Sequence, residues 1–535
     1  MRTPSVVGII IVIITMFGLF KYDLHSSQSP VNVWITTSDQ RKLLHQEADL
    51  AWVKDNTLND STIVIDGEKE YQQIDGFGAA MTDSSAWLIA NKLNPEQRSD
   101  LMNKLFDHKQ GIGISYLRLP MGATDFSLKS YTYDDMPDGQ TDPKLQNFTI
   151  DYDKAYIIPT LLKAKELNLD LKIMGSPWSA PAWMKKSGSL IKGSLNPDFY
   201  QAYADYFTKF VQAYTAEGLP IDAVTPQNEP HIEPDGYPGM RMEPADQANF
   251  IKSHLGPAFE QAKLGTKIVI WDHNWDEPYY PIQILIDPEA SKYIAGSAFH
   301  GYAGEVSSQQ KVHDMFPNKD IYFTESSGGE WMADFAGSLR WDMQNLIIGS
   351  TRNWAKTVLK WNLALDESFG PKNGGCPNCR GFVKIDQKTG EISYNPEYYA
   401  FGHASKFVRA GAYRIDSNTL GSGNIEDVAF RNPDGSEVLI AFNSAAESRS
   451  FKVQRGGKSF SYVLPAGAAA TFVWTGEKRG AKYGGVIQNE QGDIKDRPCR
   501  DRKYCGVCSW ATPFSFVHFK RHIWTLFMSC FFIRK

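Results

Sequence analysis

Two glutamates stand where short apolar runs end, at positions typical of the carboxyl end of a buried strand. Glu229 lies in AVTPQNEP, residues 223–230, and Glu325 follows IYFT and precedes serines and glycines. Side chains at the carboxyl ends of parallel strands in one barrel share a rim. Two carboxylates on one rim can split a glycosidic bond, because one protonates the leaving oxygen while the other attacks the anomeric carbon. A glutamate that only caps a helix or pairs with a base is the alternative for each, so the surrounding elements decide.

The chain between residues 76 and 366 alternates short β-rich apolar runs with longer amphipathic ones. One longer run, residues 196–214, repeats aromatic residues at steps of three and four, which predicts a helix with one buried face, capped by Asn196 and with Pro197 in its first turn. Eight strand-then-helix units over about 290 residues are what a (β/α)8 barrel, or TIM barrel, requires. The eight predicted strands are residues 76–83, 114–122, 171–177, 221–229, 266–274, 296–302, 320–326 and 359–366.

Outside this span the pattern changes to strands alone, with two runs before the barrel and several after Ala404. Asp434 and Gly435 mark a hairpin turn among the later runs. We therefore predict an α/β protein, a (β/α)8 TIM barrel at residues 76–403 with an attached β-sandwich built from both chain ends, residues 29–75 and 404–476. Three ordinary domains are the alternative that a length of 535 residues allows.

The two termini have compositions of their own. Residues 6–20 are fifteen uncharged residues, apolar except for Thr15 and ended by Lys21, a length that suits a signal peptide better than a membrane span. Because no clear cleavage site follows, an uncleaved anchor is the alternative for residues 1–28, and either one predicts an exported protein, with membrane-surface association in the anchored case. Residues 477–535 are basic, hold four of the six cysteines and lack periodicity, which predicts an unstructured tail.

Composition and charge exclude some functions. A net charge of −5 argues against a dedicated nucleic-acid binder. The 14 Trp and 24 Tyr supply rings of the kind that line sugar sites, although most such rings are core.

Two carboxylates suffice for glycoside cleavage and no ligand cluster occurs on the predicted rim, so we expect no metal and no organic cofactor. Full activity in a strong chelator is the expected result, and turnover that zinc or calcium restores would contradict it.

Six motifs resemble glycoside hydrolase family 30, in particular its glucosylceramidase-like branch. They are QQIDGFGAAMTD, YLRLPMGATDFS, SPWSAPAWMK, QNEP, WNLALD and LPAGAAATFVW, and they extend in order from about Tyr71 to Trp474. The resemblance implies the same barrel with a sandwich from both chain ends. It also implies a retaining β-glycosidase, with no cofactor and with a β-glucoside such as glucosylceramide or a β-glucan as its substrate.

The resemblance also implies roles for single residues. Glu229 matches the acid/base, Glu325 the nucleophile, and Arg118 the arginine that holds the nucleophile's carboxylate. The acid must be protonated near neutral pH while the nucleophile is ionised, so their surroundings must separate the two pKa values. The residues matched to substrate binding are Asn228 at the sugar 2-hydroxyl, Asp125 and Trp178 at the far hydroxyls, His300 and Tyr302 near the nucleophile, and Trp361 at the pocket floor. Taken alone, each of these would more often be a buried polar group or a core ring.

Two departures from the family pattern affect the leaving-group side. Gly301 replaces a tryptophan of animal lysosomal members, and the loop at residues 369–382 differs, with Cys376 and Cys379 either joined in a disulfide or free. Our leading hypothesis is a secreted glucosylceramidase-like enzyme that acts on glucosylceramide or a related β-glucoside. An endo-β-1,6-glucanase or β-xylosidase of the same family is the alternative, since an open rim admits a second sugar. A carbohydrate-binding barrel without turnover is the non-enzyme alternative.

Overall fold

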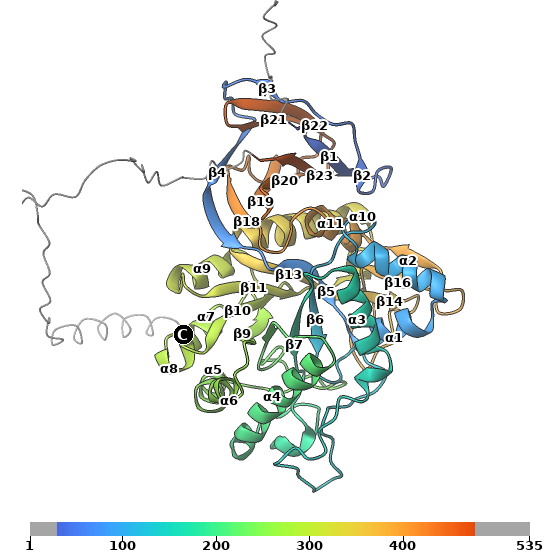
Figure 1. Cartoon of the computed structure of the whole chain (residues 1–535), viewed down its shortest axis with the longest axis vertical. Coiled ribbons are helices and arrows are strands. Elements are labelled where there is room, and N and C mark those ends of the chain that lie inside the picture. The colour runs from blue at the N-terminus through green and yellow to red at the C-terminus, as the bar shows by residue number, and fades with distance from the viewer. Residues whose placement is uncertain (1–28, 477–535) are drawn as a thin grey trace, which may run out of the picture. The chain divides into compact units, whose positions relative to one another are not determined.

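The computed structural model describes residues 29–476, and Figure 1 shows its ribbon. The predicted signal peptide or anchor at residues 1–28 and the predicted unstructured tail at residues 477–535 lie outside the described residues. Within the described part of the chain, no helix is both long and apolar enough to cross a membrane.

Eight parallel strands close into a barrel, and two β-rich chain ends form a sandwich, which confirms the predicted fold class. The fourth barrel strand is only two residues long, and the eighth begins at Ala355, earlier than expected. In chain order the barrel strands are β5 (Gly76–Ala80), β6 (Tyr116–Pro120), β7 (Lys172–Ser176), β8 (Ala223–Val224), β9 (Lys267–Asn274), β10 (Ile294–His300), β11 (Asp320–Glu325) and β13 (Ala355–Asn362).

Helices connect successive barrel strands and cover the outside of the barrel (Figure 1). The predicted helix after Asn196 opens with a 3-10 turn, Pro197–Phe199, and its buried aromatic face continues in the α-helix that follows. The α-helices are α1 (Asp83–Asn91), α2 (Pro95–Phe106), α3 (Ile157–Leu167), α4 (Tyr200–Ala216), α5 (Pro244–Phe250), α6 (Gly256–Gln261), α7 (Tyr279–Leu285), α8 (Pro288–Ser291), α9 (Ser307–Met315), α10 (Phe335–Trp341) and α11 (Pro396–Ser405). The π-helical segments η4 (Ile251–Leu255) and η6 (Asp342–Ser350) and the 3-10 turns η1 (Asp153–Ala155), η2 (Ala182–Met184) and η5 (Glu330–Met332) complete the set.

The interior of the barrel is filled by one apolar layer to which seven strands contribute. Its fully buried members are Tyr116, Met174, Ala223, Val269, Ala298, Tyr322 and Leu359. Residues i and i+2 of a strand face the same side, so the next inward layer lies two residues further toward the carboxyl ends. That layer contains Arg118, Ser176, Thr225, His300, Thr324 and Trp361. Most of these side chains are polar, so a polar layer lies directly above the apolar layer, which we call the barrel plug.

Both chain ends build the β-sandwich. β1 (Asn32–Thr36) pairs antiparallel with β23 (Ala469–Thr475), and the long strand β4 (Thr62–Gln73) pairs with β21 near its start and with β18 further on. Apolar side chains of both layers meet in a second core that includes Ile63, Phe451 and Phe472. The other sandwich strands are β2 (His45–Gln46), β3 (Val53–Lys54), β18 (Tyr413–Ser417), β19 (Ile425–Arg431), β20 (Ser436–Asn443), β21 (Arg449–Arg455) and β22 (Lys458–Leu464).

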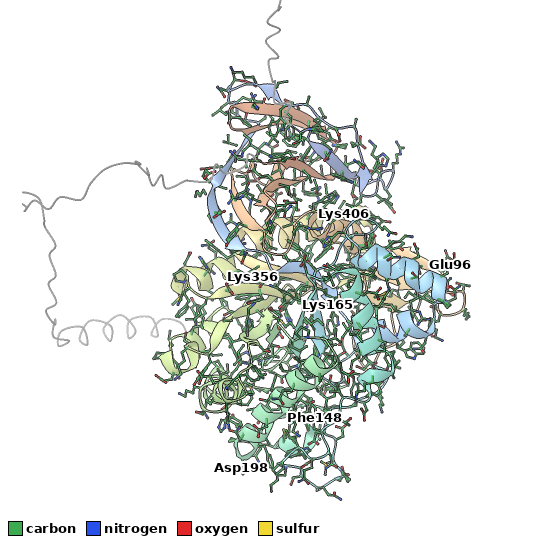
Figure 2. All side chains as sticks on the ribbon, in the orientation of Figure 1. Glu96, Phe148, Lys165, Asp198, Lys356 and Lys406 are labelled. Atoms are coloured by element: carbon green, nitrogen blue, oxygen red, sulfur yellow. A yellow bond between two sulfur atoms is a disulfide. The ribbon has the colours of Figure 1, made fainter. Side chains whose placement is uncertain are left out.

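Charged side chains tie together the amino ends of the barrel strands, away from the predicted rim. Asp75 precedes β5 and accepts a hydrogen bond from Lys172 at 2.6 Å. Lys356, labelled in Figure 2, lies 3.4 Å from Asp75 and donates to Asp320 at 2.9 Å. These pairs link four strands at the face where barrel enzymes place stability and not catalysis.

Candidate active site

Several side chains of the polar layer above the barrel plug hydrogen bond to Asp272, a residue that was not predicted from the sequence. The side chain is fully buried. Its two oxygens accept hydrogen bonds from Arg118, Thr225 and Thr324 at 2.7 Å and from Ser176 at 2.8 Å. Burial opposes a charge here, but the Arg118 charge and the His300 hydrogen bond outweigh it and hold the pKa of Asp272 well below its usual range. Asp272 is therefore a fixed negative charge at the centre of the site.

A β-bulge in β9 brings Asp272 into that layer. Alternation along β9 would point Trp271, two residues after Val269, toward the barrel axis. Trp271 and Asp272 instead adopt left-handed backbone conformations, with φ of 74° and 63°, and the pairing with β10 skips Asp272. Trp271 packs against Tyr280, with 4.4 Å between ring centroids. Bulges re-aim side chains in this way next to active sites, at a cost of about 1–3 kcal/mol for each strained residue.

Arg118 on β6 is fully buried and contacts one of the two predicted catalytic glutamates. Its Nη1 donates to Oε2 of Glu325, and its Nη2 donates to Oδ1 of Asn228 and to Asp272, each at 2.7 Å. The guanidinium also lies 4.8 Å from the ring centroid of Trp178. A planar donor fixed on several sides can orient the Glu325 carboxylate as well as favour its charge.

The two glutamates face each other at the carboxyl ends of β8 and β11. Glu229 lies five residues beyond β8 in a left-handed conformation, φ 44°, and its backbone N–H donates to the carbonyl of Asp272 at 3.0 Å. Glu325 ends β11, and its Oε1 accepts a hydrogen bond from the Tyr302 hydroxyl at 2.9 Å. One oxygen of each carboxylate and one ring nitrogen of His300 lie within 4.8 Å of one another.

His300 bridges two carboxylates with its two ring nitrogens. Its Nδ1 lies 3.1 Å from Oε1 of Glu229, and its Nε2 lies 3.1 Å from Oδ1 of Asp272. Burial disfavours the charged ring, but the Glu325 charge and the bonds to Asp272 and Glu229 outweigh it and raise the pKa of His300 to about 9. Within residues 29–476, Glu229, His300 and Glu325 form the one group spaced closely enough to hold a metal ion, and both ring nitrogens of His300 already face carboxylates.

The pKa order of the two glutamates is opposite to the order expected from their matched roles. Burial raises the pKa of Glu229, but the hydrogen bond to His300 and the His273 charge outweigh it, so the net shift is downward. Burial raises the pKa of Glu325, and the charges of His300 and Arg118 oppose that rise without cancelling it. The reason is His300: as an imidazolium bonded directly to Glu229, it favours the charge on that carboxylate in the free enzyme.

A pocket of about 370 Å³ opens beside the two carboxylates, and Asp125, Trp178 and Trp361 line it. The two indoles stack, with 4.9 Å between ring centroids and 22° between planes. Oδ1 of Asp125 is buried and has no hydrogen-bond partner within the described part of the chain. Burial and the charges of Glu325 and Glu229 raise the pKa of Asp125 well above its usual range. A buried acceptor beside aromatic rings can receive sugar hydroxyls.

Asn228 also lines this pocket, and since its Oδ1 accepts from Arg118, its amide NH2 remains for a ligand oxygen. The sequence analysis missed Tyr237 and Trp331, which complete the wall. Tyr237 lies in an irregular segment and Trp331 in the short 3-10 turn η5, so no strand periodicity marks an inward side for either. The sequence signal for Trp331 was its position six residues after the matched nucleophile, and the structure shows this ring to be 56% exposed.

A disulfide between Cys376 and Cys379 lines the same pocket and answers the question that the sequence left open. The loop that carries it packs on Asp125, because the Asn373 N–H donates to the Asp125 carbonyl at 2.7 Å and Gly375 lies directly against the Asp125 side chain. Short strands continue the wall: β12 (Gly328–Gly329) pairs with β15 (Cys379–Arg380), and β14 (Ala364–Asp366), β16 (Val383–Ile385) and β17 (Ile392–Tyr394) form a small sheet.

Two facing carboxylates on a barrel rim, beside a ring-lined pocket, are the arrangement of glycoside hydrolases, enzymes that act on O-glycosyl bonds. Comparison with known families gives the particular one. Residues 74–408 match the Glycosyl hydrolase family 30 TIM-barrel domain, and residues 411–472 match the family 30 beta sandwich domain. The chain belongs to glycosyl hydrolase family 30, which confirms the resemblance of its six motifs and makes it a glycoside hydrolase.

The chain is similar to proteins with two different names. Endo-1,6-beta-D-glucanase neg1 of Aspergillus fumigatus is 34% identical over 432 residues, which are 75% of this chain and 85% of the relative. Lysosomal acid glucosylceramidase of Mus musculus is 31% identical over 440 residues, which are 77% of this chain and 83% of the relative. Among solved structures, the endo-beta1,6-glucanase BT3312 is 35% identical with a TM-score of 0.78, and the match covers 83% of this chain and 99% of that one.

Proposed function

We propose that this enzyme hydrolyses β-glucosidic bonds with retention of configuration, with Glu229 as acid/base and Glu325 as nucleophile. The observation that carries the proposal is the spacing of the two carboxylates. Their nearest oxygens lie within 4.8 Å. Retaining enzymes keep the two carboxyl groups about 5–5.5 Å apart, whereas an inverting pair needs roughly 6.5–9.5 Å to admit water. The short gap supports direct attack by one carboxylate on the sugar.

The hydrogen bonds of Glu325 support its role as the nucleophile. Arg118 donates to one of its oxygens and Tyr302 to the other, so the carboxylate is held in one orientation. The anomeric carbon is attacked, the glycosidic bond breaks, and a glycosyl-enzyme ester forms. Water then cleaves that ester, with the second glutamate taking its proton. Asn228, which lines the pocket beside Glu229, supplies an amide for the sugar 2-hydroxyl.

The proton for the leaving group is available at the Glu229–His300 hydrogen bond. With the pKa of His300 raised to about 9, this pair holds a proton throughout the neutral range. Transfer of that proton from Nδ1 to Oε1 produces a protonated Glu229 beside an ionised Glu325. This arrangement is the reactive one, and it reconciles the low pKa of Glu229 in the free enzyme with its role as an acid.

For the substrate we propose a β-1,6-glucan, with glucosylceramide as the second candidate. Similarity to proteins named endo-1,6-beta-glucanases supports the first, together with Gly301, which leaves the rim open where lysosomal members carry tryptophan. Similarity to the mouse glucosylceramidase supports the second.

Export is part of the proposal, because residues 6–20 are uncharged and almost all apolar. Detection of the mature protein outside the producing cell, with its amino terminus sequenced, tests that part.

Product analysis on a substrate panel tests the proposal. The panel contains a β-1,6-glucan, glucosylceramide, an aryl β-glucoside and an aryl β-xyloside, and the configuration of the first-formed sugar is read by NMR. Oligosaccharides from the glucan, with β-configured products, are the expected result. Release of ceramide alone would favour the second candidate, and an α-configured first product would exclude the retaining mechanism.

A further inference from the structure

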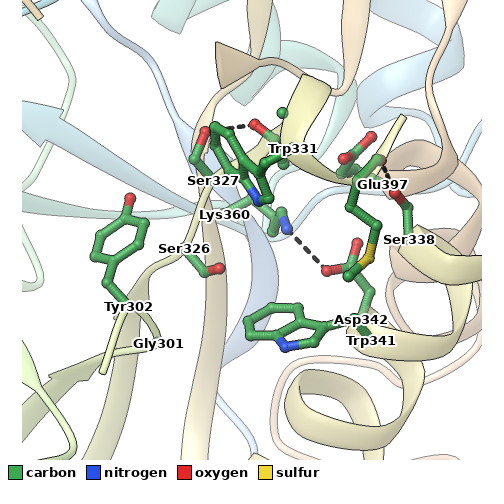
Figure 3. A pocket seen from close by; sticks show the side chains of 13 residues that line it. Gly301, Tyr302, Ser326, Ser327, Trp331, Ser338, Trp341, Asp342, Lys360 and Glu397 are labelled. Atoms are coloured by element: carbon green, nitrogen blue, oxygen red, sulfur yellow. Dashed lines mark hydrogen bonds and ion pairs between the residues drawn. The ribbon is translucent and has the colours of Figure 1, made fainter. Parts of the chain in front are cut away.

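A second pocket adjoins the catalytic one. It has a volume of about 390 Å³, and Figure 3 shows the side chains that line it. Tyr302 and Trp331 line both pockets, so the two are neighbours across these two side chains. The wall beyond them is formed by the loop after Glu325, by α10 and η6, and by Lys360 and Glu397.

Two buried carboxylates in this second pocket have unused acceptor capacity. Asp342 is 2% and Glu397 1% exposed. Lys360 donates to Oδ1 of Asp342 at 2.8 Å, and Arg380 donates to Oε1 of Glu397 at 3.0 Å, but Oδ2 of Asp342 and Oε2 of Glu397 have no partner within residues 29–476. Leaving a buried charged acceptor without a donor is costly, so both oxygens call for a ligand that brings O–H or N–H groups.

Aromatic rings flank these polar groups. Figure 3 shows the Asp342–Lys360 pair between the indoles of Trp331 and Trp341, and the Lys360 ammonium lies 5.4 Å from the ring centroid of Trp341. Flat rings beside carboxylates and an ammonium suit a pyranose, which presents an apolar C–H face and a rim of hydroxyls. An acyl chain does not suit the pocket, because it would cover both carboxylates with methylene groups that cannot donate hydrogen bonds.

Gly301 and Gly328 lie in the wall of the second pocket. A Cβ on Gly301 would stand 3.2 Å from the Trp341 ring and 3.1 Å from that of Phe323, so a larger side chain here would be driven against the pocket wall. The backbone of Gly328 lies directly against the carboxylate of Glu397, which leaves no room for a side chain. Gly328 therefore has to remain glycine for the second pocket to keep its present shape, whereas a side chain at Gly301 would require its ring neighbours to shift slightly.

We propose that this second pocket is the subsite for the sugar unit on the leaving-group side of the scissile bond, with Asp342 and Glu397 accepting its hydroxyls. The inference rests on the proposed function, since it needs a glucoside held between Glu229 and Glu325. Asp342 and Glu397 would make a second hexose, and not a lipid, the preferred leaving group. None of the four side chains Ser338, Trp341, Asp342 and Glu397 contacts the two catalytic glutamates through any hydrogen bond or ion pair between described residues.

Two substrates distinguish a defect in the proposed subsite from a defect in the catalytic pocket. β-Glucosyl fluoride has a leaving group that fills no subsite, whereas gentiobiose, the β-1,6-linked disaccharide, leaves a glucose. In Asp342→Asn we expect kcat/KM for gentiobiose to fall at least about tenfold, because a bond to a buried charge is lost, and kcat/KM for the fluoride to stay within about twofold. Glu397→Gln, which keeps the side-chain shape, should give the same split.

Asp427→Asn is the matched control. Asp427 is also fully buried, pairs with Arg352 at 3.1 Å and has one oxygen without a partner among the described residues. Its pKa, like that of Asp342, is raised to about 6 by burial. It lies on β19 in the sandwich and should leave both substrates within about twofold. Equal losses on both substrates, or no loss on gentiobiose, in a folded Asp342→Asn or Glu397→Gln would overturn the subsite. A wild type that cleaves the fluoride but not gentiobiose would overturn it too, while failure on both substrates would refute the proposed function itself.

Discussion

At the scale of single residues, the two catalytic candidates differ in the groups that hydrogen bond their oxygens. Glu325 accepts from Arg118 and Tyr302, whereas Glu229 contacts His300. In Glu325→Ala, turnover of every substrate should fall about 10⁴-fold or more, because no group remains to attack. In Glu229→Ala, dinitrophenyl glucosides should remain good substrates for forming the glycosyl-enzyme, since their leaving group needs no proton. Steady-state and pre-steady-state kinetics measure both.

Azide gives the two variants different products. In Glu229→Ala, azide can enter from the acid/base side and should yield a β-glucosyl azide with retained configuration. In Glu325→Ala, azide can enter only from the vacated nucleophile side and should yield an inverted product. NMR of the isolated azides distinguishes them, and the same product from both variants would contradict the role assignment.

Asp125 should act through sugar recognition and not through the fold. Its Oδ1 is buried and has no partner among residues 29–476, so it contributes little to stability in the free enzyme. Asp125→Ala should lower kcat/KM by about 2–4 kcal/mol in transition-state stabilisation, and Trp178→Ala by a similar amount. The free energy of unfolding of Asp125→Ala should not decrease. Near-normal kcat/KM, or a large loss of stability with normal kcat/KM in the folded fraction, would assign Asp125 a structural role.

The family resemblance identified Arg118 and His300 from the sequence, but not Asp272 or the hydroxyl side chains Ser176, Thr225 and Thr324 that bond to it. Arg118 and His300 lie two residues beyond apolar plug positions, so an inward direction could be predicted for each. Asp272 could not be found in that way, because its side chain turns inward only through a bulge with two left-handed residues. The apolar run before it, IVIW, gives no sign of a bulge in its composition. Tyr237 and Trp331 were missed because neither an irregular segment nor a three-residue 3-10 turn shows a periodicity that marks the inward side.

At the scale of elements, His300 joins the carboxyl ends of β9 and β10 to the segment after β8 through its two carboxylate partners. Its pKa is about 9 in the folded protein against 6.5 ordinarily. A raised pKa adds stability that is fully present below about pH 6.5 and is lost as the pH rises through about 9. The shift of the His300 pKa from 6.5 to about 9 corresponds to about 3 kcal/mol of unfolding free energy. Denaturant unfolding between pH 6 and pH 9.5 should show this decline.

The variant His300→Gln isolates that contribution. Glutamine keeps a hydrogen-bonding side chain but cannot titrate, so the difference in unfolding free energy between wild type and variant should shrink as the pH rises from 6.5 to 9. Groups that do not interact with His300 titrate equally in both proteins and cancel. A difference that stays constant over this range would show that His300 is neutral in the folded enzyme.

Element positions were largely predictable, and element lengths were not. All eight barrel strands occur where apolar β-rich runs predicted them, because each run fills the same interior. β8 is shorter than its run, since the chain after Val224 turns to bring Glu229 into the site. The π-helical segments η4 and η6 were not foreseen, because their hydrogen bonds span five residues where those of an α-helix span four, and this difference leaves no clear mark in the sequence.

At the scale of the whole molecule, the β-sandwich depends on pairing between strands from the two ends of the described chain. β23 pairs with β1 over five residues and with β20 over seven. Its Phe472 and Trp474 are buried in the sandwich core, and the indole of Trp474 donates to Glu437 at 3.0 Å. The carboxyl-terminal strand is therefore essential to the sandwich, which could be predicted from the apolar alternation of AAATFVW.

The chain should tolerate removal of every residue after Gly476. Gly476 follows β23 and its N–H donates to the carbonyl of Gly435 at 3.1 Å, so the last sandwich contact of the described chain is retained in the shortened protein. We expect kcat/KM on an aryl β-glucoside within about twofold of the full chain and a melting temperature within about 2 °C. A chain ending at Ala468 is the control: it lacks β23, loses two buried aromatic rings worth about 3–5 kcal/mol each, and should not fold. If the chain ending at Gly476 also fails to fold while the full chain folds, residues 477–535 belong to the structure and the proposed boundary is wrong.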